Sequence, residues 1–81
     1  MIEMTKREVA QGFLWALSEF AKLRNSEHRE AIGELGEQYT ILTASVIGEK
    51  ATLQCIRYMT SHTEPDAPTL AQFLDALTYE D

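Results

Sequence analysis

Cysteine and histidine are the residues of this chain best suited to nucleophilic or metal chemistry, and the sequence contains Cys55, His28 and His62. Cys55 and His62 are seven residues apart, so they can share one face of a helix. A metal site needs three or four ligands, and no second pair accompanies these two. A catalytic cysteine needs a low pKa and a nearby base, whereas Cys55 stands among apolar neighbours. We therefore interpret Cys55 as a small buried hydrophobic residue.

Both histidines have structural interpretations. His28 falls near the apolar side of a predicted helix, in its first turn, and we expect it to pack at one end of the helical assembly. His62 is predicted to end a helix, where the helix dipole favours a positive charge.

Three carboxylates at helical spacing, Glu30, Glu34 and Glu37, could in principle ligate a metal or shuttle protons. The Glu-x-x-His motif of di-iron bundles is missing, as are Gly-rich phosphate loops and nucleophile elbows. We interpret these glutamates as a solvated helix face, with an acidic docking stripe for a basic partner as the alternative. The sequence predicts no enzyme, no cofactor and no metal site.

Size and charge limit the remaining functions. The 81 residues predict one domain, residues 1–81, and 13 acidic against 7 basic residues give a net charge of −6. Because the basic residues are scattered, a nucleic-acid partner is not expected. One cysteine cannot form an internal disulfide, which favours a cytoplasmic location. The N-terminus lacks the apolar core of a signal peptide, and no apolar run approaches the ~18 residues of a membrane span.

The elements that position these residues are predicted to be helices. Thr5 and Glu8 have the spacing of a capping box, which predicts a helix over about 6–24. Asn25 and Ser26 interrupt it, and a second helix is predicted over about 27–42. The apolar side chains predicted to face inward on the first helix are Val9, Phe13, Leu14, Ala16, Leu17, Phe20 and Leu23. Those of the second helix are Ala31, Ile32, Leu35, Tyr39 and Leu42, with Glu27 and the three glutamates named above on a stripe facing well away.

Gly33 and Gly36 lie inside the second helix, where each costs about 1 kcal/mol of helix propensity relative to alanine. Two interpretations stay open: a tolerated weakness, or a place where another backbone approaches closely.

The hydroxyl and β-branched residues of 40–45 predict a turn, followed by a third helix over about 45–61. Pro65 ends that helix. Thr69 and Gln72 then predict the start of a fourth helix over about 69–78. The inward residues expected of the third and fourth helices are Ile47, Ala51, Cys55, Tyr58, Met59, Leu70, Phe73, Leu74 and Leu77. No strand pattern is found, so the predicted fold class is all-α: an antiparallel three-helix bundle closed by a short fourth helix.

Trp15 does not fit the apolar face of its helix, because it points nearly opposite Phe13 and Leu17. Either it is an exposed partner-binding residue, or the fourth helix or the N-terminal Ile2 and Met4 cover it. Leu53 similarly falls on a polar side of its helix. It is either a residue that contacts a partner or a lone exposed leucine. The candidate partner-binding residues are Trp15, Gln11, Glu19, Lys22, Leu53, Glu30, Glu34 and Glu37.

Four features of the chain together resemble a known family. They are the opening segment Thr5–Val9, the central Tyr39 of the second helix, the small and apolar residues Ala51, Cys55 and Ile56, and the helix entry Pro68–Phe73. With these features, the chain is similar to the small N-terminal helical domain of phage helicase loaders, of the Gram-positive loader/inhibitor type and of the lambda replication protein P type. The family's second helix usually carries a tryptophan, whereas this chain has Trp15 in the first. The family also extends into a segment that engages the helicase, and this chain stops at Asp81.

The resemblance implies a shared scaffold and transfers no functional residue. It favours a small acidic, non-enzymatic protein-binding domain, a phage-type adaptor or inhibitor that acts on a DNA replication protein such as the replicative helicase or its loader. One alternative is a phage assembly chaperone or an oligomeric structural scaffold. A DNA-binding regulator is the other, and its recognition helix would offer only Lys50 and Arg57.

Overall fold

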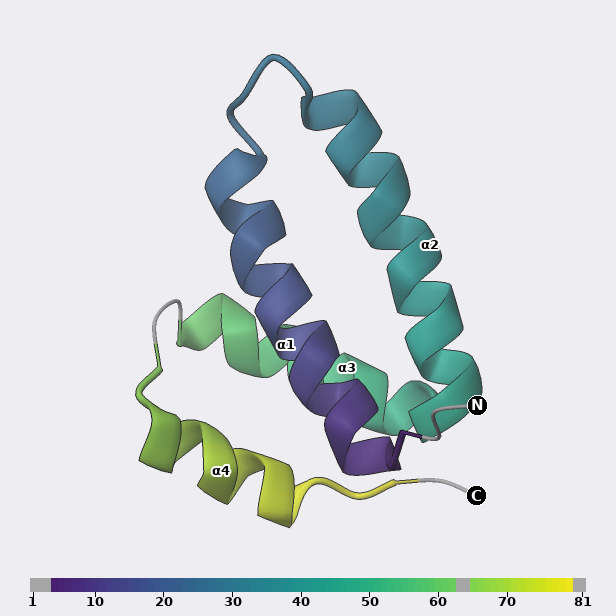
Figure 1. The fold of residues 1–81 in the computed structure, drawn as a ribbon, viewed down its shortest axis with the longest axis vertical. Helices are drawn as coiled ribbons and strands as arrows, with labels where there is room; N and C mark the ends of the chain where they lie inside the picture. The colour runs from purple at the N-terminus through teal and green to yellow at the C-terminus, as the bar shows by residue number, and fades with distance from the viewer. Residues whose placement is uncertain (1–3, 63–64, 80–81) are drawn as a thin grey trace.

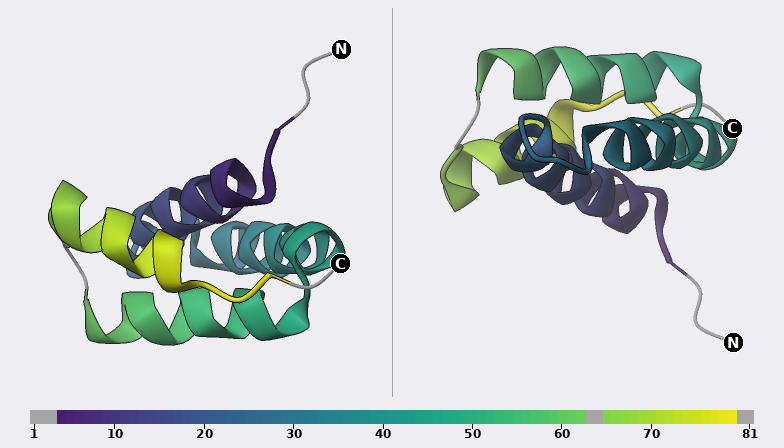
Figure 2. Two further views of the ribbon diagram at one scale, coloured as in Figure 1. Left: turned by 90° about the horizontal axis from the view of Figure 1, so that it is seen from below. Right: turned by 90° about the horizontal axis from the view of Figure 1, so that it is seen from above.

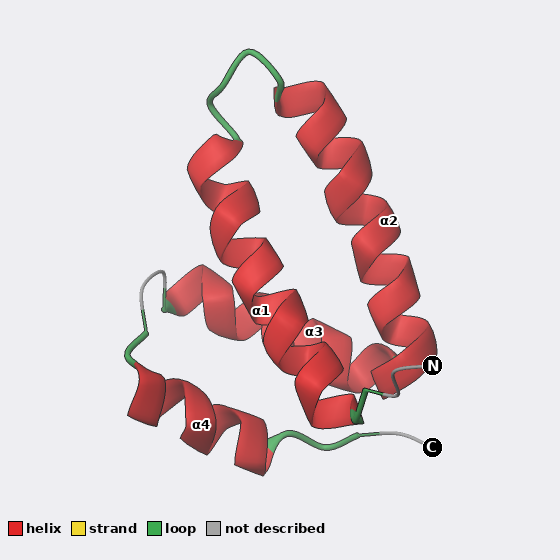
Figure 3. Cartoon of the chain, viewed as in Figure 1, coloured by secondary structure: helices red, strands yellow, loops and turns green. Residues whose placement is uncertain are grey.

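The structure is a computed structural model that describes residues 4–62 and 65–79. It contains four helices: α1 (Lys6–Leu23), α2 (Arg29–Ile47), α3 (Glu49–Ser61) and α4 (Ala67–Ala76) (Figure 1). Within the described residues no segment is a strand (Figure 3). The predicted all-α class is therefore confirmed, and the packing of the helices is consistent with a helical bundle.

The helices α1 and α2 form an antiparallel hairpin, and α3 crosses this hairpin near the end that holds the start of α1 (Figures 1 and 2). The antiparallel arrangement that was expected of three helices is seen for α1 and α2. The last helix, α4, lies beside the same end of the hairpin. We call this end the base, and the opposite end, with the connection between α1 and α2, the tip.

Among the residues that the structure describes, the fully buried core lies at the base. Nine hydrophobic residues are at most 7% exposed, and they come from all four helices and the residue that follows α4. At the tip, neither α3 nor α4 covers α1 and α2 (Figure 1). The inward positions predicted for α3 and α4 are largely confirmed. The buried residues are Ala10, Phe13, Leu14, Ile47, Ala51, Cys55, Leu70, Leu74 and Leu77.

Besides the buried leucines of α4, an aromatic stack and an ion pair attach this helix to the rest of the base. The ring of Phe73 stacks on that of Tyr58 from α3, with ring centroids 4.1 Å apart. An ion pair joins Arg7 of α1 to Asp75 of α4. Because both charged side chains are exposed, the stacking and the buried leucines contribute more to the attachment than this ion pair does.

The predicted capping box at the start of α1 is confirmed. The Glu8 amide donates to Thr5 Oγ1 at 3.1 Å, and the Thr5 amide donates to Glu8 Oε1 at 3.0 Å. These two bonds satisfy amides that the first turn leaves unpaired. The hydrogen bonds with Thr5 also lower the pKa of Glu8.

The predicted start of the fourth helix at Thr69 was wrong by two residues. Asp66 is the N-cap and accepts a hydrogen bond from the Thr69 amide at 2.9 Å, so α4 begins at Ala67. Pro68 lies in the first turn of α4. Amides in the first turn have no hydrogen-bond partner within the helix, so the missing N–H of proline costs no hydrogen bond there. Hydrogen bonds from the Thr69 side chain and amide lower the pKa of Asp66.

The predicted turn at 40–45 was also wrong, because α2 continues to Ile47. Its hydroxyl groups bond to carbonyls of the preceding turn: Thr40 to Gly36 at 2.7 Å and Ser45 to Leu42 at 2.6 Å. These bonds are compatible with a continuous helix. The break comes at Gly48, whose φ of 94° belongs to the region that favours glycine. At its other end α2 begins at Arg29, two residues later than predicted.

Candidate protein-binding surfaces

The thiol of Cys55 lies in the core of the base, as its apolar neighbours predicted. It is fully buried, and this burial raises its pKa to about 12. At neutral pH the group is therefore a protonated thiol without access to solvent. Within residues 4–62 and 65–79, no group of three or more His, Cys, Asp or Glu side chains is placed to hold a metal ion.

Trp15 is exposed on α1, with 57% of its surface accessible. Beside it lies a small apolar hollow that is shared with Met59 of α3 and with Pro65 and Leu70 at the start of α4. The helix α4 therefore flanks the indole and leaves more than half of it open. Met4, which was expected as an alternative cover, is itself 57% exposed, and Ile2 lies outside the described residues.

Polar side chains from the same helix surround Trp15. Gln11 and Glu19 lie one turn before and one turn after it, and both are exposed. Lys22 is also exposed and pairs with Glu19 at 3.3 Å between Nζ and Oε1. These four residues form one surface, which we call the Trp15 surface: Gln11, Trp15, Glu19 and Lys22.

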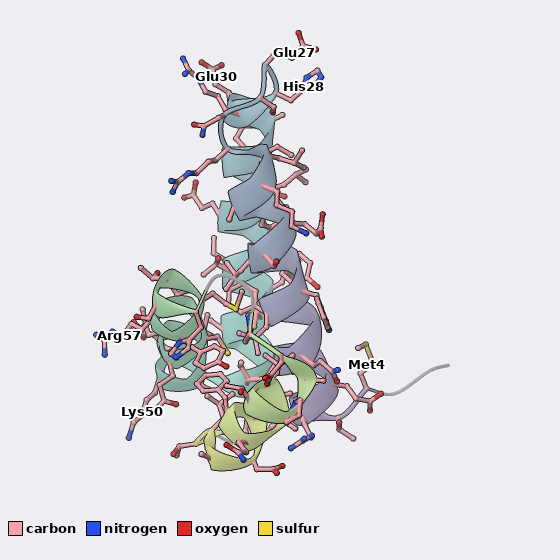
Figure 4. All side chains as sticks on the ribbon, turned by 90° about the vertical axis from the view of Figure 1, so that its left-hand side faces the viewer. Met4, Glu27, His28, Glu30, Lys50 and Arg57 are labelled. Carbon is pink, nitrogen blue, oxygen red and sulfur yellow. The ribbon has the colours of Figure 1, made fainter. Side chains whose placement is uncertain are left out.

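The other candidate residues lie on other helices. Leu53 is exposed on α3, on the side away from Ala51 and Cys55. Glu30, Glu34 and Glu37 are exposed on α2, and Figure 4 places Glu30 near the tip, far from Lys50 and Arg57 of α3. The candidates therefore form separate surfaces.

The prediction for His28 was wrong. Its side chain is 73% exposed at the tip, where Nε2 lies 3.4 Å from Glu27 Oε1 (Figure 4). The reason is that the core lies at the base, so the tip offers nothing for an imidazole to pack against.

The apolar face predicted for the second helix was also largely wrong, because most of it is exposed. Leu35 and Leu42 are 56% and 67% exposed, and Ala31, Tyr39 and Val46 are exposed as well. The helix instead buries Thr43 and Ile47 against the base. Thr43 follows Leu42 directly, so its side chain points about 100° away around the helix. We call the exposed stripe the α2 seam: Leu35, Tyr39, Leu42 and Val46.

The middle of the α2 seam is held firmly by aromatic packing. The Tyr39 ring stacks on Phe13 with centroids 5.9 Å apart, and it meets the edge of Phe20 at 6.3 Å. A shallow groove of about 180 Å³ lies next to Tyr39, toward the base. It is lined by Val9 of α1 and by Tyr39, Leu42, Thr43 and Val46 of α2. The seam therefore presents one fixed ring beside an apolar hollow. Such preformed features suit a docking surface.

Another hollow, which the sequence did not predict, lies between α3 and α4. It has a volume of about 420 Å³ and is lined by Gln54, Arg57, Tyr58, Phe73, Ala76 and Leu77. The Tyr58 ring is stacked between His62 and Phe73. Gln54 Oε1 and the Tyr58 hydroxyl are buried, and neither has a hydrogen-bond partner among the described residues. No spacing rule in the sequence indicates that α3 and α4 will leave this space between them.

Comparisons of the chain with known protein families, with curated proteins and with solved structures found no match. Among the described residues, no helix combines the length and the hydropathy that are needed to cross a bilayer.

Proposed function

We propose that this chain is a small acidic, non-enzymatic protein-binding domain, and that the Trp15 surface is its main docking site. The observation that carries the proposal is the exposure of the chain's single tryptophan, 57%, on a helix whose other large apolar residues mostly face inward. Tryptophan is strongly enriched at binding hot spots, where it fills a pocket on the partner. Around it, Gln11, Glu19 and Lys22 supply the polar rim that interfaces usually have.

The kind of partner follows from the resemblance to the N-terminal domain of phage helicase loaders. On that basis the partner is a DNA replication protein, such as the replicative helicase or its loader, and the chain is a phage-type adaptor or inhibitor. A cytoplasmic site of action fits both this partner and the unpaired Cys55.

The acidic stripe of Glu30, Glu34 and Glu37 adds a second contact in this proposal. Its three exposed carboxylates would steer a basic partner toward the domain, and added salt would weaken that effect.

Affinity capture tests the proposal. The tagged wild-type chain, Trp15→Ala and the control Ile41→Ala are incubated with bacterial lysate, and bound proteins are identified by mass spectrometry. Ile41 is a suitable control because it is an exposed apolar residue outside both the Trp15 surface and the α2 seam. We expect the wild type and the control to retain a replication protein that Trp15→Ala loses. Equal capture by all three variants, or retention of no replication protein, would count against the proposal.

Intrinsic fluorescence tests the same surface without a tag. Because Trp15 is the only tryptophan, emission reports on this one site. We expect emission close to that of a solvated indole for the free chain, and a blue shift when the captured partner is added. An unchanged spectrum in the complex would place the interface elsewhere.

The oligomeric scaffold is the second candidate function, and one observation favours it. In the α2 seam, Leu35, Leu42 and Val46 are exposed apolar side chains in the single chain.

A further inference from the structure

The helix α4 is separated from α3 by a space and does not pack against it along its length. No Cα atom of α4 lies within 8 Å of a Cα atom of α3. The hollow of about 420 Å³ lies between the two helices, and the stack of Phe73 on Tyr58 crosses from one to the other. In Figure 1, α4 forms an outer edge of the base. Side chains alone therefore connect α4 to α3 across this space.

The attachment of α4 to the base depends mainly on three leucines. Leu70, Leu74 and Leu77 are 6%, 3% and 7% exposed. The ion pair of Arg7 with Asp75 is exposed and adds little. The helix has ten residues, and isolated helices shorter than about 12–15 residues are marginal in water. Because α4 is helical only while it is docked, its detachment and its unfolding are one event.

Two polar atoms in the wall of the hollow oppose this attachment. Gln54 Oε1 and the Tyr58 hydroxyl are buried, and neither has a hydrogen-bond partner among the described residues. Each group has given up its hydrogen bonds to water without a replacement, which is unfavourable. Because both atoms are buried, a ligand in the hollow would not contact them while α4 is docked. Detachment of α4 returns both groups to water.

The start of α4 also covers apolar surface beside the indole of Trp15. Pro65 and Leu70 line the small hollow next to this ring, together with Leu14 and Met59. Leu14 is only 1% exposed in the folded chain. Detachment of α4 removes Leu70 from this hollow, so that Leu14 and Met59 become accessible. Opening of α4 therefore enlarges the apolar surface next to Trp15.

We propose that α4 is a flap that detaches as one unit while α1, α2 and α3 stay folded, and that the unpaired polar atoms of Gln54 and Tyr58 set how readily it opens. The other three helices pack against one another in all pairs, so they keep contacts that do not involve α4. Proteins open in such cooperative units at free energies below that of global unfolding. Opening is a property of the free chain, so this proposal does not rest on the proposed function.

Hydrogen exchange of the full chain, followed by NMR at increasing urea concentrations, tests the flap. The amides of Phe73 and Leu74 should be protected at least tenfold less than that of Leu14 in α1. Their protection should also depend less on urea, because opening exposes less surface than global unfolding does. Exchange of α4 only together with the whole chain, or residue by residue without any dependence on urea, would overturn the flap. The measurement needs no partner, so its failure leaves the proposed function standing.

Tyr39→Ala distinguishes opening of α4 from global unfolding. Tyr39 packs within the α1–α2 hairpin, which stays intact when α4 opens. The protection of Leu14 should therefore fall in this variant, whereas the protection of Leu74 should not change. Equal falls at the two amides would show that α4 unfolds only with the rest of the chain.

Tyr58→Phe tests the unpaired polar atoms. It keeps the ring stack and removes the hydroxyl, so the protection of Leu74 should rise about tenfold. The matched control Tyr39→Phe removes a hydroxyl from α2 and should leave Leu74 unchanged. Gln54→Met removes the other unpaired oxygen from a side chain of similar length and should act as Tyr58→Phe does. Unchanged or lower protection of Leu74 in either α3 variant contradicts the role given to Gln54 and Tyr58.

Discussion

The hydroxyl of Tyr39 lies 3.6 Å from the point where a Cβ on Gly12 would stand, so α2 reaches across to α1 directly above a residue without a side chain. The same ring packs against Phe13 and Phe20 of α1. Tyr39 therefore joins the two arms of the hairpin where the core of the base gives way to the open tip, and its outer side belongs to the α2 seam.

Tyr39→Ala should destabilise the chain by about 2 kcal/mol. A buried aromatic residue costs about 3–5 kcal/mol when it is cut back to alanine, and Tyr39 is only partly buried. Tyr39→Phe keeps the ring contacts and should change the free energy of unfolding by less than about 0.5 kcal/mol. Urea titrations followed by circular dichroism measure both variants. If both variants lose the same free energy of unfolding, the hydroxyl of Tyr39, and not its ring, holds the two helices of the hairpin together.

Gly33→Ala should stabilise the chain by about 1 kcal/mol, because a Cβ at this position would meet nothing within 4 Å and alanine has the higher helix propensity. Thermal unfolding should show a higher Tm. Within one chain, Gly33 is thus a tolerated weakness, which was one of the two interpretations left open. If Gly33→Ala is more stable but fails to capture the partner, the glycine serves a close approach in the complex.

Gly48→Ala should have the opposite sign and destabilise the chain by about 1–3 kcal/mol. Gly48 has φ 94° and ψ 154° between α2 and α3, a conformation that residues with a Cβ adopt only under strain. Gly33→Ala is the matched control, because the substitution is the same and only the backbone conformation differs. The two variants are compared by urea unfolding. A neutral Gly48→Ala would show that the junction adjusts without strain.

The Cys55 thiol should make stability fall at alkaline pH. Its pKa is about 12 in the folded chain against an ordinary value of 9.0, so the folded state keeps its proton longer than the unfolded state does. The stabilisation is fully present below about pH 9 and is lost as pH rises toward 12. The limiting slope is about 1.4 kcal/mol per pH unit.

Urea unfolding of the wild type and of Cys55→Ala between pH 8 and about pH 10.5 isolates this effect, because tyrosine titration is common to both. The free energy of unfolding of the wild type should fall more steeply than that of the variant. The thiol of the folded wild type should also resist a disulfide reagent that modifies it in urea. Rapid modification without urea, or parallel pH curves, would contradict the burial of Cys55.

Features that depend on neighbours in the sequence were predicted well. The capping box of Thr5 and Glu8 and the burial of Cys55 and Leu70 follow from residue types at helical spacing. The end of α2 was missed, because the hydroxyl-rich 40–45 segment is typical of turns, whereas here its hydroxyls bond to carbonyls of the preceding turn and the helix continues. The four residues of the Trp15 surface could be placed on one helix face from their spacing, but whether the indole is covered was left open, and only the tertiary structure decided it.

By itself, the sequence determined that the chain forms amphipathic helices and which residues lie on each stripe, because both depend on the 3.6-residue period and on local capping. Only the tertiary structure decided which stripes are covered. The helix α3 turns away at Gly48 and crosses the hairpin at the base, so Thr43 and Ile47 are buried while Leu35 and Leu42 remain exposed. Burial depends on which helix arrives from elsewhere in the chain, and no local pattern in α2 contains that information.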